Sequence, residues 1–111
     1  MDKITVSLLI WERLVLGKVV GSLPAGSATI GSLRQGQKIM GILELTEDEK
    51  REAKFRIDSY GNSHWGAVEP KPIDFTFADH EFLKKAVAAY DSWPSGDALA
   101  SSLALAEKFG L

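Results

Sequence analysis

Polar and apolar residues alternate at the start of the chain and then change to a helical period. From Lys3 to Leu8 the alternation is strict and favours β-branched side chains, which predicts a short half-buried strand. From about Ile10 the apolar positions recur on two sides of a helix, which we expect to be buried over much of its circumference and to stop at Pro24. Within it, Gly17 and Gly21 have a spacing that hints at a tight crossing inside the molecule or with another one.

A second helix is expected from about 29 to 43, and a short third one follows it. The second helix has Arg34 and Lys38 as an exposed pair and a row of positions at helical spacing: Ile30, Leu33, Gln37 and Met40. Three glycines in this segment each cost a helix about 0.8–1 kcal/mol relative to alanine. Thr46 and Glu49 then form a capping box that predicts a helix over 47–53.

The central part of the chain predicts β structure. Alternation on either side of the dipeptide Gly61-Asn62 predicts a β-hairpin over 55–68 with a two-residue turn. A third strand is expected over 72–77, and we expect it to form one three-stranded region with the hairpin.

Two more helices are expected before the C-terminus. Asp79 is placed to cap the first of them. The second has a single apolar stripe and is ended by Gly110; the stripe consists of Leu99, Leu103, Ala106 and Phe109.

The order of these elements predicts a small α+β domain that spans residues 1–111. It comprises about four helices, the hairpin over 55–68, the strand over 72–77 and an N-terminal strand over 3–8. Hydrophobic residues make up 45% of the chain, which is enough for a core. The chain has no cysteine, which excludes disulfide scaffolds, Cys-ligated zinc and thiol catalysis. The apolar stretch 14–23 is too short for a membrane span and the N-terminus has no signal-peptide pattern, so we expect a cytoplasmic protein without a membrane partner.

Charge is distributed unevenly along the chain. Residues 1–43 carry +3, residues 44–56 carry −1 and residues 57–111 carry −4, for a formal net charge of −2. No segment has the dense Lys/Arg patch of a nucleic-acid footprint, so we expect no nucleic-acid partner.

Four residues are candidates for binding an anionic ligand. Gly26 to Ser32 has the glycine spacing of a phosphate loop but lacks the lysine that should follow the second glycine. A Gly/Ser turn entering a helix that carries Arg34 and Lys38 still suits an anion, although a flexible turn with solvated charges explains it as well. Trp65, with Arg56 nearby, is able to stack on a base if it faces outward; the alternative is a core tryptophan.

The two histidines do not complete a recognisable catalytic or metal site. Asp79, His80 and Glu81 are adjacent, but neighbouring helical residues point in different directions. The chain contains no Gly-x-Ser-x-Gly elbow either, so hydrolase activity is not indicated. We therefore expect neither a cofactor nor a metal.

The order of several short motifs resembles a group of small accessory proteins encoded in tailed-phage and prophage genomes. The motifs are Glu12-Arg13-Leu14, Leu23-Pro24 with a small-residue turn, Leu45-Thr46-Glu47-Asp48-Glu49, His64-Trp65 and a last helix closing on Glu107-Lys108-Phe109. This chain departs from the group at Leu9, where a capping threonine is usual, and in the extra glycines of the second helix. The resemblance implies a fold and a phage context in a host cell, and no particular mechanism.

These observations favour a non-enzymatic protein that binds, and inhibits or redirects, a host protein, and that is able to form homo-oligomers. One alternative is a sponge that sequesters an anionic signalling nucleotide through Arg34, Lys38, Trp65 and Arg56. A second alternative is a winged-helix-like DNA binder with the 55–68 hairpin as its wing, although the acidic C-terminal half opposes it.

Five glycines stand five residues apart, from Gly21 to Gly41. A five-residue step turns a helix by about 140°, so these glycines cannot line one face. We expect residues 21–41 to be the most mobile or the most closely approached part of the fold, and the place where a partner or ligand docks.

Overall fold

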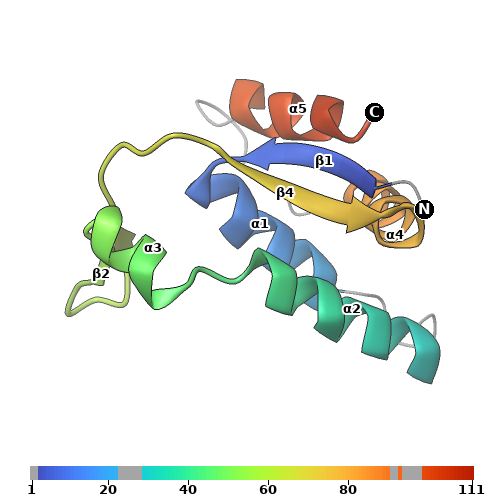
Figure 1. Cartoon of the computed structure of the whole chain (residues 1–111), viewed down its shortest axis with the longest axis horizontal. Helices are drawn as coiled ribbons and strands as arrows, with labels where there is room; N and C mark the ends of the chain where they lie inside the picture. The colour runs from blue at the N-terminus through green and yellow to red at the C-terminus, as the bar shows by residue number, and fades with distance from the viewer. Residues whose placement is uncertain (1–2, 23–28, 91–92, 94–98) are drawn as a thin grey trace.

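The structure, a computed structural model, describes residues 3–22, 29–90, 93 and 99–111. In this part of the chain it contains five helices and four strands and confirms the predicted α+β class (Figure 1). In chain order the elements are β1 (Lys3–Leu8), α1 (Ile10–Gly21), α2 (Ile30–Leu43), α3 (Glu47–Glu52), β2 (Arg56–Ile57), β3 (Ser63–His64), β4 (Lys71–Thr76), α4 (Phe77–Ala89) and α5 (Leu99–Lys108).

The strands form two separate antiparallel pairs. β1 pairs with β4 in a register that runs from Lys3 opposite Thr76 to Leu8 opposite Lys71. The prediction of a three-stranded region was therefore wrong, because β4 joins the N-terminal strand and leaves the hairpin β2–β3 on its own. Both members of the β1–β4 pair bury the same face, formed by Val6, Leu8, Ile73 and Phe75.

The predicted hairpin is present, but its strands are short and its turn is wider than the expected two residues. Arg56 pairs with His64 and Ile57 with Ser63, so the loop spans residues 58–62. The Asp58 carboxylate accepts hydrogen bonds from the N–H groups of Tyr60 (2.9 Å) and Asn62 (3.0 Å). In a tighter turn these N–H groups would bond to backbone carbonyls. Here the Asp58 side chain accepts from them instead, which stabilises the longer loop.

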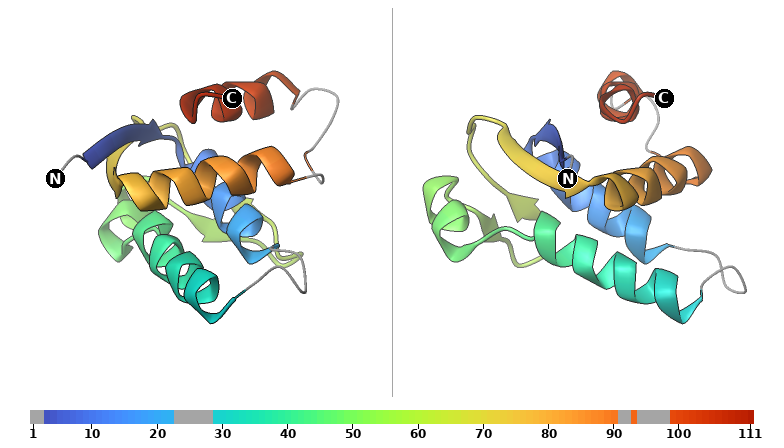
Figure 2. Two further views of the ribbon diagram at one scale, coloured as in Figure 1. Left: turned by 90° about the vertical axis from the view of Figure 1, so that its right-hand side faces the viewer. Right: turned by 45° about the vertical axis from the view of Figure 1, so that its right-hand side comes forward.

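The helices cover the buried face of the β1–β4 pair, with α5 and α2 on opposite sides of the molecule and α4 between them (Figure 2). One core cluster joins the sheet to α1, α2, α4 and α5 through fully buried side chains such as Leu16, Ile39, Leu83, Leu105 and Phe109. A second, smaller cluster lies under the hairpin and is built on Ile10, Leu45 and Ala53.

Threonine side chains cap three helices of the described chain, α2, α3 and α4. Thr46 caps α3 as expected, and Thr29 caps α2; each accepts a hydrogen bond from the N–H three residues ahead (3.1 Å). Asp79 does not cap α4: the cap is Thr76, whose hydroxyl accepts from the Asp79 N–H at 3.1 Å. The Asp79 carboxylate is thereby free to contact α2.

The apolar stripe predicted for the last helix is correct for Ala106 and Phe109, which pack on the core, and wrong for Leu99 and Leu103. Leu99 and Leu103 are exposed, whereas Ser102, Leu105 and Phe109 are buried. Both sets have helical spacing, so the period alone does not choose between them.

Candidate functional site

The apolar row of α2 faces outward. Ile30, Leu33 and Met40 are 67%, 50% and 45% exposed, while the buried face of the helix is formed by Gly36, Ile39 and Leu43. Large apolar side chains that stay exposed together along one face of a helix are a feature of surfaces that contact other molecules.

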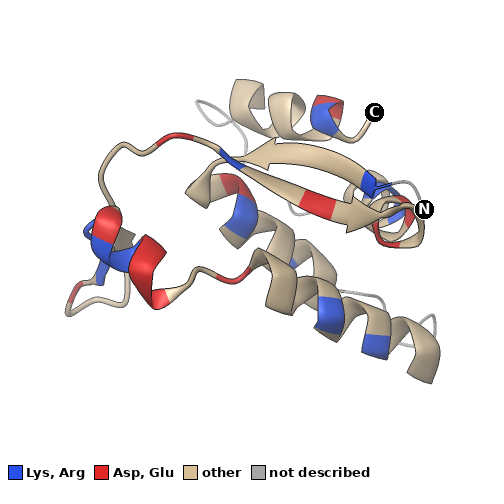
Figure 3. Cartoon of the chain, in the orientation of Figure 1, with Lys and Arg blue, Asp and Glu red and all other residues tan. Residues whose placement is uncertain are grey.

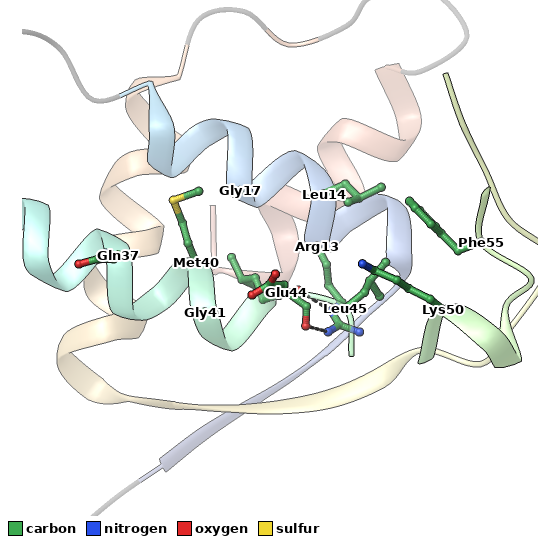
Figure 4. Close-up of a pocket in the computed structure, with 11 residues that line it drawn as sticks. Arg13, Leu14, Gly17, Gln37, Met40, Gly41, Glu44, Leu45, Lys50 and Phe55 are labelled. Atoms are coloured by element: carbon green, nitrogen blue, oxygen red, sulfur yellow. Dashed lines mark hydrogen bonds between the residues drawn. The ribbon is translucent and has the colours of Figure 1, made fainter. Parts of the chain in front are cut away.

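Next to this row, α1 and α2 enclose an open groove. A cavity of about 750 Å³ lies between the two helices and reaches α3 and the start of the hairpin; its lining includes Arg13, Leu14, Gly17, Met40, Gly41 and Phe55. Met40 extends from α2 toward the turn of α1 that contains Gly17 (Figure 4). A second cavity of about 610 Å³ shares Gln37 and Met40 with the first and continues along α2 past Leu33 to Ile30. The two cavities together are called the α1–α2 groove.

Glycines leave this groove open. A Cβ atom added at Gly17, Gly21 or Gly41 would meet no atom within 4 Å, whereas one added at Gly36 would come within 3.2 Å of Val20 Cγ1. The close crossing of α1 and α2 therefore lies at Gly36 and not at the Gly17–Gly21 pair. Residues 21–41 were expected to be the most mobile or the most closely approached part of the fold. Close approach is found at Gly36, and residues 30–43 form a regular helix with one exposed face. Residues 23–28 lie outside the described residues.

Alanine scanning at two glycines of α2 should separate these roles. Gly41→Ala is expected to raise the free energy of unfolding by about 0.8–1 kcal/mol, because it improves helix propensity and meets no neighbour. Gly36→Ala crowds Val20, and overpacking costs about 1–3 kcal/mol. Urea unfolding should therefore rank Gly36→Ala below Gly41→Ala by at least about 1 kcal/mol; equal stabilities would contradict this account of the crossing.

One buried arginine fixes the end of the groove. The Arg13 side chain donates from Nε to the Leu43 carbonyl (2.9 Å) and from Nη2 to the Glu44 carbonyl (2.7 Å), and it pairs with Glu49 Oε2 at 2.5 Å. It is only 3% exposed. Arg13 therefore holds the C-terminal carbonyls of α2 and the first turn of α3 against α1.

Glu49 is a strong partner because several donors converge on it. The hydrogen bond from Arg13 lowers its pKa most; burial raises it, and the Thr46 N–H and the nearby charges of Arg13 and Lys71 lower it further, to about 2. Lys71 Nζ lies 3.4 Å from Glu49 Oε1, so β4 also contributes to this cluster.

This lowered pKa predicts a loss of stability in acid. The pKa of Glu49 is about 2 in the folded chain and 4.5 ordinarily, so its contribution is complete above pH 4.5 and is lost as the pH falls toward 2. Urea midpoints measured between pH 7 and pH 2 should fall less steeply in Glu49→Gln than in the parent. Glu47→Gln is the matched control, because Glu47 is exposed and its contact with Lys50 is long, 3.6 Å. Parallel pH profiles for all three proteins would contradict the assignment.

The exposed surface around the groove is mainly cationic. Helix α2 carries two cations and no carboxylate (Figure 3). Lys38 Nζ lies 2.9 Å from Asp79 Oδ2 on α4, and Asp79 also accepts from Gln35 Nε2 at 3.2 Å. Burial raises the pKa of Asp79, but the contacts with Lys38, Gln35 and Thr76 outweigh it and lower the pKa. Of the four cations on α1 and α2, Arg13 and Lys38 are paired, whereas Lys18 and Arg34 form no ion pair with any described residue and are left for a partner.

The four residues named as candidates for a nucleotide site lie in two places. Arg34 and Lys38 are on α2, whereas Arg56 and Trp65 belong to the hairpin region, which lies beyond α3 at the other end of the molecule (Figure 1). Trp65 is half-buried, stacks on Phe55 with ring centres 6.1 Å apart, and packs on the second core cluster. The structure brings Arg34 and Lys38 to the same face of α2 and does not bring the other two to them.

The histidines have local partners. His64 Nε2 lies 2.7 Å from Asp58 Oδ2, and this hydrogen bond is the main cause that lowers the pKa of Asp58. His80 packs against Phe109 with ring centres 5.3 Å apart. No group of three or more potential metal ligands occurs among the residues that the structure describes.

Glu12 and Arg13 are the residues whose importance the sequence reasoning missed. Glu12 is 2% exposed and accepts from the Leu9 N–H (2.8 Å) and from Lys108 Nζ (2.6 Å). A signal was present, because two adjacent charges interrupt a helix that is otherwise almost wholly apolar. Charged residues in such a position are rarely buried unless they are paired.

Comparison of the chain with protein-family models, curated proteins and solved structures finds no match. In the described ranges, none of the helices is both long and apolar enough to span a membrane.

Proposed function

We propose that the protein acts by binding a partner protein in the α1–α2 groove, without a catalytic step. The observation that carries this proposal is the exposed row of Ile30, Leu33 and Met40 beside a groove whose floor contains Gly17 and Gly41. Apolar, concave and well-supported surfaces of this kind suit the central part of a protein interface.

The groove is held on rigid elements. Arg13 fixes the C-terminal end of α2 to α1, and the contacts of Lys38 and Gln35 with Asp79 fix its middle to α4. A binding surface that is ordered in advance loses less conformational entropy when a partner docks. The resemblance to phage accessory proteins supports a host protein as the partner.

Site-specific photocrosslinking in bacterial cells tests the proposal. A benzophenone amino acid at Leu33 or Met40, inside the groove, is expected to form a covalent adduct with a partner protein. The same amino acid at Lys85, which is exposed on α4, provides the control. Adducts from position 85 but from neither groove position, or from no position, would overturn the proposed function.

A further inference from the structure

We infer that the groove accepts an amphipathic α-helix of a partner protein, with carboxylates flanking its apolar stripe. This inference rests on the proposed function and specifies the partner's chemistry. Three observations support it: the exposed apolar row on α2, the open space over α1, and the charges beside both helices.

The spacing of the exposed row fits a helix. Ile30, Leu33, Gln37 and Met40 occupy positions i, i+3, i+7 and i+10 of α2. Such a row is the seam against which a second helix interdigitates its own apolar side chains. An extended segment would present side chains with a period of two residues and would match this row poorly.

The glycines of α1 permit a close approach of the partner backbone. Gly17 and Gly21 are one helical turn apart, and a Cβ atom at either position would point into open space. Gly41 is equally open on the α2 side of the same groove. A partner helix is therefore able to lie over α1 and α2 together, in contact with the glycines of one and the apolar row of the other.

The charges beside the groove indicate which residues flank the apolar stripe of the partner helix. Arg34 lines the groove and Lys18 is exposed directly after Gly17, and within the described chain neither has an ion-pair partner. Lys38 is also more than half exposed, at 57% of its side chain, although it contacts Asp79. The carboxylate in the lining is Glu44, at the end of α2. Carboxylates on the partner would complement the cations, whereas a second copy of the chain docking through α2 would bring Arg34 and Lys38 toward like charges.

Selection from a displayed library of helical peptides tests this inference. In the library the apolar stripe is fixed, and the flanking positions are randomised among Asp, Glu, Lys, Arg and Ser. We expect enriched peptides to carry carboxylates and to become helical on binding, as measured by circular dichroism. Their affinity is then measured by fluorescence anisotropy at low and high salt.

Matched variants locate the binding site. Gly41→Leu fills the groove and is expected to weaken the best peptide by more than about tenfold. Gly31→Leu should leave binding unchanged, because Gly31 is an exposed residue of α2 that lines neither cavity and whose added Cβ would make only an ordinary contact with Thr29 Oγ1, at 3.8 Å. Arg34→Glu should weaken acidic peptides by about fivefold at low salt, and less at high salt, while Lys85→Glu should have no such effect.

Four outcomes would overturn the inference: enrichment of basic flanks, no enrichment, binding that Gly41→Leu does not reduce, or a dimer of the free chain that Gly41→Leu dissociates. A crosslinked partner that occupies the groove through a basic or extended segment would also overturn it and would leave the proposed function standing. If neither groove position forms a crosslink, the proposed function and this inference are both overturned.

Discussion

Replacing Arg13 with methionine is expected to lower the free energy of unfolding by about 3–5 kcal/mol, as is typical when one partner of a buried ion pair is removed. The methionine side chain is similar in size to that of arginine, but it can form none of the hydrogen bonds that Arg13 donates. The carbonyls of Leu43 and Glu44 and the carboxylate of Glu49 would then lose their shared donor, although Lys71 and the Thr46 N–H still contact Glu49.

Urea unfolding followed by circular dichroism measures this effect, and the chain offers a matched control. Arg51→Met removes an arginine from an ion pair with Asp48 in which both side chains are more than three-quarters exposed, at 77% and 88%. Such surface pairs contribute about 0–1 kcal/mol, so the control should unfold close to the parent. Similar losses in the two variants would show that the burial of Arg13 confers no special role. A peptide that binds the groove should also bind Arg13→Met more weakly, even under conditions where the variant stays folded.

Elements specified by local interactions could be predicted from the sequence. The strand at Lys3–Leu8 follows from its alternation, and the start of α3 follows from a capping box within four residues. The pairing of β1 with β4 could not be predicted in the same way, because it joins segments more than sixty residues apart along the chain. Alternation identifies a strand and its buried face but not the strand beside it.

The orientation of α2 shows a different limit of sequence reasoning. The row beginning at Ile30 has helical spacing, yet it faces solvent, and Gly36 and Ile39 face the core instead. Helical periodicity predicts that one face of a helix is apolar, but not whether another part of the same chain covers that face. The sequence does not distinguish the roles of the glycines in α2 either. Gly36 is required because Val20 packs closely against it, whereas Gly41 has open space around it.

Of the candidate site, the sequence indicated the region but not its geometry. The expectation that a partner docks within residues 21–41 stays a prediction, and the groove proposed above includes residues of this range. Arg34 remains available to a partner, but the engagement of Lys38 by Asp79 and the stacking of Trp65 on Phe55 depend on tertiary contacts. Arg13 was missed because an arginine side chain is ordinarily exposed, even in a helix whose other residues are mostly apolar.

Replacing Lys108 with methionine is expected to cost about 2–4 kcal/mol and to loosen α5 selectively, since it leaves the buried Glu12 carboxylate with one neutral donor, the Leu9 N–H. Lys108 Nζ also donates to the Ser7 carbonyl at 2.9 Å, so the same side chain ties α5 to the edge of β1. Amide hydrogen exchange should therefore rise in α5 before it rises in α1 or α2.

A double substitution identifies the cause. Glu12→Gln combined with Lys108→Met leaves no unpaired charge, so it should recover part of the stability that Lys108→Met loses, whereas two independent losses would add. Lys85→Met, on the exposed face of α4, controls for the loss of a surface lysine. Because Glu12 and Arg13 are adjacent on α1, each change should act on its own side: Lys108→Met on α5, and Arg13→Met on α2 and the groove. Loosening of α2 by Lys108→Met to the same extent as α5 would contradict this division.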